Sequence, residues 1–184
     1  LRTGWSAISI DPAGRRVTAV ETATTREEQF TYDHLVIGTG ASPLRPPIPG
    51  IDLPGVHGVQ TLDDGLRVLD SLHREPQHAV VVGAGYIGIE MAEAMCRRGL
   101  PVIVVDQAEE PMTALDPDMG ALIGKAMAGM GITYRGGEAV TRIEAGESGR
   151  VAAVVTAEGR YPADIVLLGL GVKPNTELAQ AAGL

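Results

Sequence analysis

The stretch Ala79-Val80-Val81-Val82-Gly83-Ala84-Gly85-Tyr86-Ile87-Gly88 decides the fold of this chain. Its first four residues are apolar and run into a glycine, which predicts a short buried β-strand. After the glycines, Ile87, Met91, Ala94 and Met95 recur at the spacing of one helix face. A strand that passes through Gly-X-Gly-X-X-Gly into a helix is the βα unit with which dinucleotide-binding α/β domains begin.

Each glycine of this unit has its own expected role. Gly83 permits the tight turn, Gly85 lets the backbone approach a pyrophosphate, and Gly88 allows the helix to pack closely on the sheet. The phosphates are expected at the helix N-terminus, where free N–H groups and the helix dipole favour an anion. The helix is expected to end before Gly99, which follows two arginines and suits a C-terminal cap.

The acid at the end of the next expected strand, residues 102–105, supports this interpretation. Asp106 stands where a carboxylate hydrogen-bonds the ribose hydroxyls of a dinucleotide. A carboxylate there would repel the 2′-phosphate of NADP, and no Arg occurs from Gln107 to Thr113. We therefore expect NAD as the cofactor, with NADH favoured over NADPH.

Strands and helices are expected on both sides of this unit. The proline-rich residues 43–54 exclude helix and central strand and predict a linker. One helix with an acidic first turn is expected after Asp63, and another from about Asp116, its cap, to Met130. Further strands are expected at residues 5–10, 17–20, 30–32, 35–37, 132–135, 139–143, 151–156 and 165–168.

Two segments, residues 33–43 and 164–174, share one pattern at an offset of 131 residues (164 minus 33). Each has Asp, then one residue, three apolar residues, and Gly, Gly and Pro at five, seven and ten positions after the Asp. Each also follows hairpin-like strands, so we infer a duplicated architecture. The glycine motif of the second copy stands 81 residues before its Asp (164 minus 83). An equivalent motif of the first copy is expected about fifty residues before Leu1, inside a longer protein.

Composition narrows the class of protein. The formal charge of −8 and the sequence pI of about 4.9 argue against nucleic acid or an anionic membrane as the main partner. No apolar run approaches the roughly 18 residues of a membrane span. The single cysteine, Cys96, excludes a disulfide within the chain and fits a reducing compartment, so we expect a cytoplasmic protein. The histidines are scattered and no metal-ligand spacing occurs, so no metal site is expected.

Three residues near the glycine motif have two readings from the sequence alone. Tyr86 either covers a ligand or is an exposed loop aromatic. Glu90 is either functional or a first-turn acid favoured by the helix dipole, and the sequence alone favours the second interpretation. Cys96 has no neighbouring Cys or His, which favours a small helical core residue over a redox centre.

These residues together resemble the flavin-dependent pyridine nucleotide-disulfide oxidoreductase family over nearly the whole chain. Residues 31–43 look like the segment that ends the first half of the family's FAD domain, and residues 83–90 look like its NAD(P)H fingerprint. Residues 171–175 look like the exit from its NAD domain. Within the family, residues 85–94 and Pro111-Met112 look most like the CoA-disulfide reductase, NADH oxidase and NADH peroxidase branch.

The resemblance implies roles that the sequence pattern does not. Tyr86 becomes a gate between nicotinamide and flavin, and Ile87 and Glu90 become contacts on the nicotinamide side. The backbone of Gly171 would lie near the carboxamide, while Thr39 and Gly40 would lie beside FAD. The family's first FAD glycine motif, its redox-active cysteine and its second FAD segment do not occur in this chain.

We therefore expect an α/β fold with a Rossmann-like NAD-binding domain and part of an FAD-binding domain of the same type. Residues 1–52 are assigned to the partial FAD domain and linker, residues 53–172 to the NAD domain, and residues 173–184 to the return segment. The resemblance implies an FAD-dependent NAD(P)H oxidoreductase that passes hydride from NADH to FAD and on to a disulfide, peroxide or oxygen. The full-length protein is expected to be a homodimer, and this portion alone is expected to be inactive and colourless.

Two other functions stay open. An NADH-dependent ferredoxin or rubredoxin reductase would use the same two-domain scaffold and would need no redox cysteine near the flavin. A non-enzymatic NAD-binding sensor would need no flavin, and the FAD-like residues 1–47 speak against it. The sequence does not identify the final electron acceptor, and fold alone does not settle function.

Overall fold

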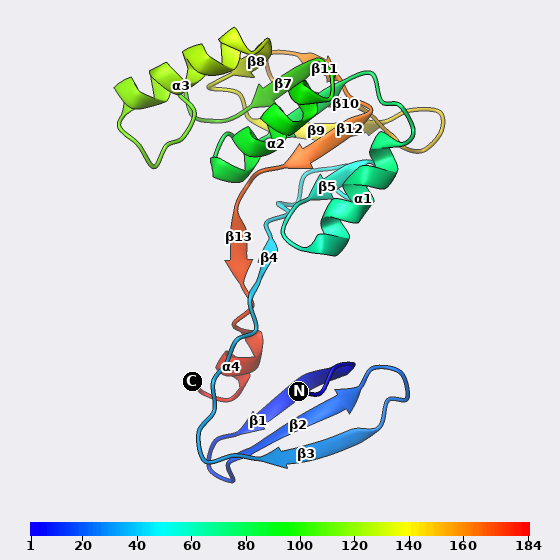
Figure 1. Ribbon diagram of the computed structural model, residues 1–184, viewed down its shortest axis with the longest axis vertical. Coiled ribbons are helices and arrows are strands. Elements are labelled where there is room, and N and C mark those ends of the chain that lie inside the picture. The colour runs from blue at the N-terminus through cyan, green and yellow to red at the C-terminus, as the bar shows by residue number, and fades with distance from the viewer. The chain divides into compact units, whose positions relative to one another are not determined.

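The computed structural model describes all residues, 1–184, and divides them into two compact units (Figure 1). The first unit comprises Leu1–Ser42 and Lys173–Leu184, and the second comprises Pro43–Val172. No helix combines the length and the apolar character that a membrane crossing requires.

The second unit is built on a five-stranded parallel sheet with the strand order β5-β12-β6-β7-β8. Its central strands are short and almost entirely apolar, which is why they are buried on both faces. The strands are β5 (Val56–Gly58), β6 (Ala79–Val82), β7 (Val102–Val105), β8 (Ile132–Arg135) and β12 (Ile165–Leu168). This sheet with its crossover helices confirms the predicted Rossmann-type α/β fold.

Side chains alternate between two apolar cores on the two faces of that sheet. On one face, Val81 and Val104 pack with residues of the helices α1 (Leu62–Leu72), α2 (Tyr86–Arg97) and α3 (Pro117–Gly129). On the other face, Val80 and Val166 pack with residues of an antiparallel sheet made of β9 (Val140–Ala145), β10 (Val151–Thr156) and β11 (Arg160–Pro162). Figure 1 shows these three layers as helices, parallel sheet and antiparallel sheet.

The helix boundaries follow the predicted capping residues. Asp116 is the N-cap of α3 with Pro117 at its first turn, and Gly99 follows α2 with a φ of 82°. Thr61 and Asp64 form a capping box at the start of α1. The expected buried face of α2 is partly wrong, because the helix buries Gly88, Ala92 and Met95 while Ile87 stays exposed.

The first unit contains a three-stranded antiparallel sheet made of β1 (Trp5–Asp11), β2 (Arg16–Glu21) and β3 (Glu27–Thr31). The predicted turn between β1 and β2 is present, and Asp11 accepts a hydrogen bond from the N–H of Gly14 at 2.8 Å. The rings of Trp5 and Phe30 meet edge to face with centroids 5.8 Å apart. The short helix α4 (Glu177–Ala181) completes this unit.

The prediction of a buried strand at residues 35–37 is wrong. The segment has no strand structure, and Val36 is 92% exposed. A parallel strand needs hydrogen-bonding neighbours, and no other strand of residues 1–184 pairs with this segment. The sequence analysis also did not predict four three-residue strands, namely β4 (Ala41–Pro43), β5, β11 and β13 (Val172–Pro174), of which β4 pairs with β13.

Candidate dinucleotide-binding site

The glycine-rich turn lies at the carboxyl end of β6, where it leads into α2. Two of its glycines are required by packing within the protein. A Cβ on Gly83, whose φ is 97°, would lie 2.6 Å from the carbonyl oxygen of Gly169, and a Cβ on Gly88 would collide with the carbonyl oxygen of Gly83. Gly169 is equally confined, because its Cβ would lie 2.7 Å from the Cα of Gly88. The turn, the start of α2 and the end of β12 therefore pack backbone against backbone.

Gly85 differs from these glycines. Its φ of −77° suits any residue, and a Cβ there would meet no protein atom closer than the carbonyl oxygen of Gly169 at 4.0 Å. Gly85 is the N-cap of α2 and provides no side-chain hydrogen bond to the first turn. Neither backbone strain nor packing explains a glycine at this position. The open space above it and the uncapped helix N-terminus suit an anionic ligand that approaches the backbone.

Asp106 follows β7, and both of its carboxylate oxygens accept hydrogen bonds from backbone N–H groups. Oδ2 accepts from Ala84 at 2.5 Å and Oδ1 accepts from Ala108 at 2.8 Å. The predicted acid and the predicted turn are thus in direct contact. A carboxylate has about four lone-pair sites, so these two bonds leave acceptor capacity for ribose hydroxyls.

The segment after β7 is fixed from several sides. The amide N–H of Met112 donates to the carbonyl oxygen of Ala84 at 2.9 Å, although Met112 has a left-handed φ of 59°. The hydroxyl of Tyr134 on β8 donates to the carbonyl oxygen of Ala108 at 2.8 Å. Burial, followed by the nearby carboxylates Asp106, Glu110 and Glu109, raises the pKa of Tyr134, so this hydroxyl stays a hydrogen-bond donor.

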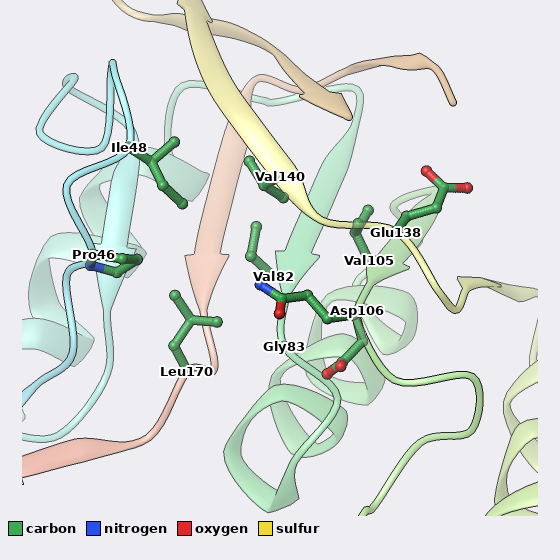
Figure 2. Close-up of a pocket in the computed structure, with 10 residues that line it drawn as sticks. Pro46, Ile48, Val82, Gly83, Val105, Asp106, Glu138, Val140 and Leu170 are labelled. Atoms are coloured by element: carbon green, nitrogen blue, oxygen red, sulfur yellow. The ribbon is translucent and has the colours of Figure 1, made fainter. Parts of the chain in front are cut away.

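A cavity of about 420 Å³ lies at the carboxyl ends of β6 and β7 (Figure 2). Such a position, at the carboxyl ends of parallel strands, is where open α/β sheets bind ligands. Figure 2 shows Ile48, Val82, Val140 and Leu170 as apolar side chains around the open space, with Asp106 beside Gly83. The remaining lining residues are Pro46, Gly83, Val105, Asp106, Gln107 and Glu138.

Glu138 is a lining residue that the sequence analysis did not single out. Its carboxylate accepts hydrogen bonds from the hydroxyls of Tyr161, at 2.7 and 2.9 Å, and of Thr156, at 2.7 Å. In Figure 2 this carboxylate points away from the apolar walls of the cavity. Nothing in the sequence around Glu138 could have identified it, because both partners come from strands far along the chain.

Of the residues that the family resemblance placed at the nicotinamide, Tyr86, Ile87 and Glu90 lie on the first two turns of α2, and Gly171 follows β12. Tyr86 is 65% exposed, Ile87 is 38% exposed, and Glu90 one turn later is exposed as well. Gly171 has a left-handed φ of 86°, and its carbonyl oxygen accepts a hydrogen bond from the N–H of Leu44 at 2.9 Å. All four residues belong to the second unit, and their roles toward a ligand stay predictions.

The two residues predicted beside FAD belong to the first unit. The hydroxyl of Thr39 donates to the carbonyl oxygen of Asn175 at 2.5 Å, and the side-chain amide of Asn175 donates to the carbonyl oxygen of Thr39 at 2.9 Å. The N–H of Asn175 also donates to the carbonyl oxygen of Gly40 at 2.9 Å. Gly40 has a φ of 69° and open space where a Cβ would be. The segment with Thr39 and Gly40 is thus tied to Asn175, and it keeps an open side at Gly40.

The other polar candidates do not form a second centre. No group of three or more His, Cys, Asp or Glu residues is arranged to hold a metal ion. Cys96 is half-buried against the helical core, and its thiol donates to the carbonyl oxygen of Met130 at 3.1 Å. This position fits the core residue that the sequence analysis favoured.

The glycine turn, its carboxylate partner and the parallel sheet define a Rossmann-type dinucleotide-binding protein. The sequence profile of the pyridine nucleotide-disulphide oxidoreductases matches residues 1–184, and the chain belongs to that family. Members of the family use FAD and NAD(P)H. The family resemblance predicted from the sequence is therefore confirmed.

The curated relatives include proteins named as NADH oxidases and a protein named as a rhodocoxin reductase. An NADH oxidase of Methanocaldococcus jannaschii is 37% identical over an alignment of 183 positions, which covers 98% of this chain and 40% of that protein. A rhodocoxin reductase of Rhodococcus erythropolis is 38% identical over an alignment of 186 positions, which covers 100% of this chain and 42% of that protein. The chain thus spans about two fifths of the length of these relatives.

The similar solved structures likewise include proteins named as reductases and a protein named as an NADH oxidase. A NAD-dependent persulfide reductase from A. fulgidus superimposes with a TM-score of 0.93 at 34% identity, covering 98% of this chain and 33% of that one. A ferredoxin reductase from Rhodopseudomonas palustris gives a TM-score of 0.89 at 36% identity, covering 98% and 43%. A water-forming NADH oxidase from Lactobacillus brevis, solved with NADH, gives 0.87 at 29% identity, covering 96% and 39%.

Proposed function

We propose that this chain is the NADH-binding portion of an FAD-dependent NAD(P)H oxidoreductase. The observation that carries the proposal is Gly85, a glycine that neither backbone conformation nor packing requires. A pyrophosphate at the N-terminus of α2 would need that open space, and the dipole and free N–H groups of the helix would favour its charge. The ribose hydroxyls would then reach Asp106, which stands beside the turn.

The preference for NADH over NADPH is part of this proposal. The carboxylates Asp106, Glu110 and Glu109 all act on Tyr134, whose pKa they raise after burial does. A 2′-phosphate would enter a negative field there, and residues 107–113 contain no Arg or Lys. Repulsion of that phosphate would favour NADH.

The flavin would be held in part by the backbone near Thr39 and Gly40. Gly40 fits such a contact, because the space where its Cβ would stand is empty within 4 Å. A bound flavin would supply the acceptor for hydride and a carrier of electrons to the next substrate. The chain's own part would be to bind and orient the dinucleotide, with Tyr86 proposed as the gate above the nicotinamide and Ile87, Glu90 and Gly171 as its further contacts.

The final acceptor would be a disulfide, a peroxide, oxygen or another small molecule. The names NADH oxidase and persulfide reductase among similar proteins support this group of acceptors. A second candidate is electron transfer to a small iron–sulfur protein, which the rhodocoxin reductase and ferredoxin reductase names support. A redox cysteine near the flavin in the whole protein would favour the first candidate. We also propose that the whole protein is cytoplasmic and forms a homodimer. Neither property bears on the site.

The test replaces Gly85 by valine. The Cβ of valine fits the folded turn, since the nearest protein atom is 4.0 Å away, but the side chain would occupy the space proposed for the pyrophosphate. Fluorescence titration should show saturable NADH binding to the unmodified protein and none to the variant, with unchanged circular dichroism. Gly129→Val is the matched control, because a Cβ on Gly129 also meets nothing within 4 Å and the residue lies at the far end of α3. Equal NADH affinity in a folded Gly85→Val variant would refute the proposal.

A further inference from the structure

The peptide unit of Ala84 is held at both ends by the segment after β7. Its N–H donates to Oδ2 of Asp106 at 2.5 Å, and its carbonyl oxygen accepts from the N–H of Met112 at 2.9 Å. The preceding residue is tied to β7 as well, since the N–H of Gly83 donates to the carbonyl oxygen of Val105 at 2.8 Å. The middle of the glycine turn therefore takes its position from β7 and the residues that follow it.

The bond from Ala84 to Asp106 has no ready substitute. Ala84 is 1% exposed, so in the intact protein its N–H is shielded from water and has the carboxylate as its acceptor. Ala108, the other donor to Asp106, is only half-buried, and its N–H can be hydrated. A hydrogen bond from a buried N–H to a carboxylate is among the stronger ones in proteins.

We propose that Asp106 is a positioning residue for the glycine turn as well as a partner for ribose. Through the N–H of Ala84 it holds the turn in the conformation that offers Gly85 and the start of α2 to a pyrophosphate. This inference rests on the proposed dinucleotide site. It differs from a purely repulsive role, in which removal of the carboxylate would simply admit NADPH.

The variants Asp106→Ala and Asp106→Asn distinguish the positioning role from a purely repulsive role. Both remove the charge that repels a 2′-phosphate. Asparagine keeps one carbonyl oxygen, which would go to the buried N–H of Ala84 and leave the N–H of Ala108 to water. Alanine keeps no acceptor. Positioning and ribose contact both predict that Asp106→Asn binds NADPH about tenfold more tightly than Asp106→Ala, the loss expected for one buried hydrogen bond, whereas a purely repulsive role predicts equal affinities.

A direct readout is the amide hydrogen exchange of Ala84, measured without any ligand. We expect slow exchange in the unmodified protein and in Asp106→Asn, and exchange at least about tenfold faster in Asp106→Ala. A general loss of stability would raise exchange along all of β6 and α2 and lower the melting temperature, which distinguishes it from local release. Asp116→Ala is the matched control, because it removes the same charge and the Asp116 side chain caps no N–H.

Each outcome decides the inference. NADPH affinities that are equal in the two variants, or higher for Asp106→Ala, would overturn it, as would unchanged exchange at Ala84 in Asp106→Ala. If the unmodified protein bound neither NADH nor NADPH, the proposed function would fail. The exchange of Ala84 would still show whether Asp106 holds the turn.

Discussion

Residues 33–43 and 164–174 carry the same pattern of residues but have different structures. In the second segment β12 lies between β5 and β6, and Leu167, the counterpart of Val36, is 1% exposed. In the first segment the matching residues form no strand, and Val36 is 92% exposed. A three-stranded antiparallel sheet precedes each segment, so the difference does not arise from the preceding strands. It arises from the neighbouring parallel strands, which the second segment has and the first does not.

The polar and glycine positions of the two segments differ in the same way. Oδ2 of Asp164 accepts hydrogen bonds from the N–H groups of Gln77 and His78, at 2.9 and 3.0 Å, which tie the start of β12 to the start of β6. A Cβ on Gly169 would press on the glycine turn, whereas a Cβ on Gly38 would meet nothing within 4 Å. The same residue pattern therefore forms a buried strand only where neighbouring strands pair with it.

The largest effect is expected from a charge in the apolar run. Leu167→Asp would bury a carboxylate without a partner in the core that the sheet shares with the helices, which should cost more than about 4 kcal/mol and unfold the second unit. Val36→Asp should change the free energy of unfolding by less than about 0.5 kcal/mol, because the side chain already faces solvent. Far-UV circular dichroism during urea unfolding reports mainly on the helices of the second unit. A folded second unit in Leu167→Asp would show that the strand is not a required part of the core.

A smaller effect is expected from the first glycine of each segment. Gly169→Ala would place a Cβ 2.7 Å from the Cα of Gly88, so helix and strand must separate, at a cost of about 1–3 kcal/mol. Gly38→Ala should be neutral or slightly stabilising, because its space is open and its φ is not left-handed. Urea unfolding followed by circular dichroism measures the first variant, and the fluorescence of Trp5, the only tryptophan, measures the second. Similar losses in both variants would contradict the comparison.

The aspartates give the third contrast. Asp164→Ala removes the acceptor of two backbone N–H groups and should destabilise the second unit by about 1–2 kcal/mol. Asp33 is exposed and makes no hydrogen bond or ion pair through its side chain, so Asp33→Ala should leave the first unit unchanged. The same two unfolding probes apply. A loss in the first unit as large as that in the second would mean that Asp33 has a partner role of its own.

Much of the fold follows from local sequence because the strongest signals need no distant partner. The strands at residues 132–135, 151–156 and 165–168 and the cap of α3 at Asp116 were predicted as they stand in the structure. The failure at residues 35–37 has a plain physical reason, since an apolar run fits a strand only where neighbours complete its hydrogen bonds. The unpredicted strands, such as β5 at Val56–Gly58, have too few residues to show a period.

The residues of the candidate site could be predicted from the sequence, but the hydrogen bonds between them could not. Gly83, Gly85, Gly88 and Asp106 meet as the motif predicts, because a strand–turn–helix unit fixes their spacing. Only the three-dimensional structure distinguishes the glycines that packing requires, Gly83 and Gly88, from Gly85, which packing does not require. The bond from Ala84 to Asp106 was likewise beyond the sequence, which identifies a carboxylate at the end of β7 but not the donor it faces.

The smallest effect, and the one case where the two segments should agree, concerns their second glycines. Gly40 and Gly171 both have left-handed φ values, 69° and 86°, and a Cβ would find open space at Gly40 and only Leu44 at 3.9 Å at Gly171. Alanine at either position meets no clash, so its cost is the left-handed backbone alone, about 1 kcal/mol. We expect Gly40→Ala to shift the unfolding of the first unit, followed by Trp5 fluorescence, by about as much as Gly171→Ala shifts that of the second. A turn needs its φ with or without partner strands, so this pair separates local backbone demands from the packing demands that distinguish the other three. A Gly171→Ala loss several times that of Gly40→Ala would mean that the surroundings of β12 govern this position too.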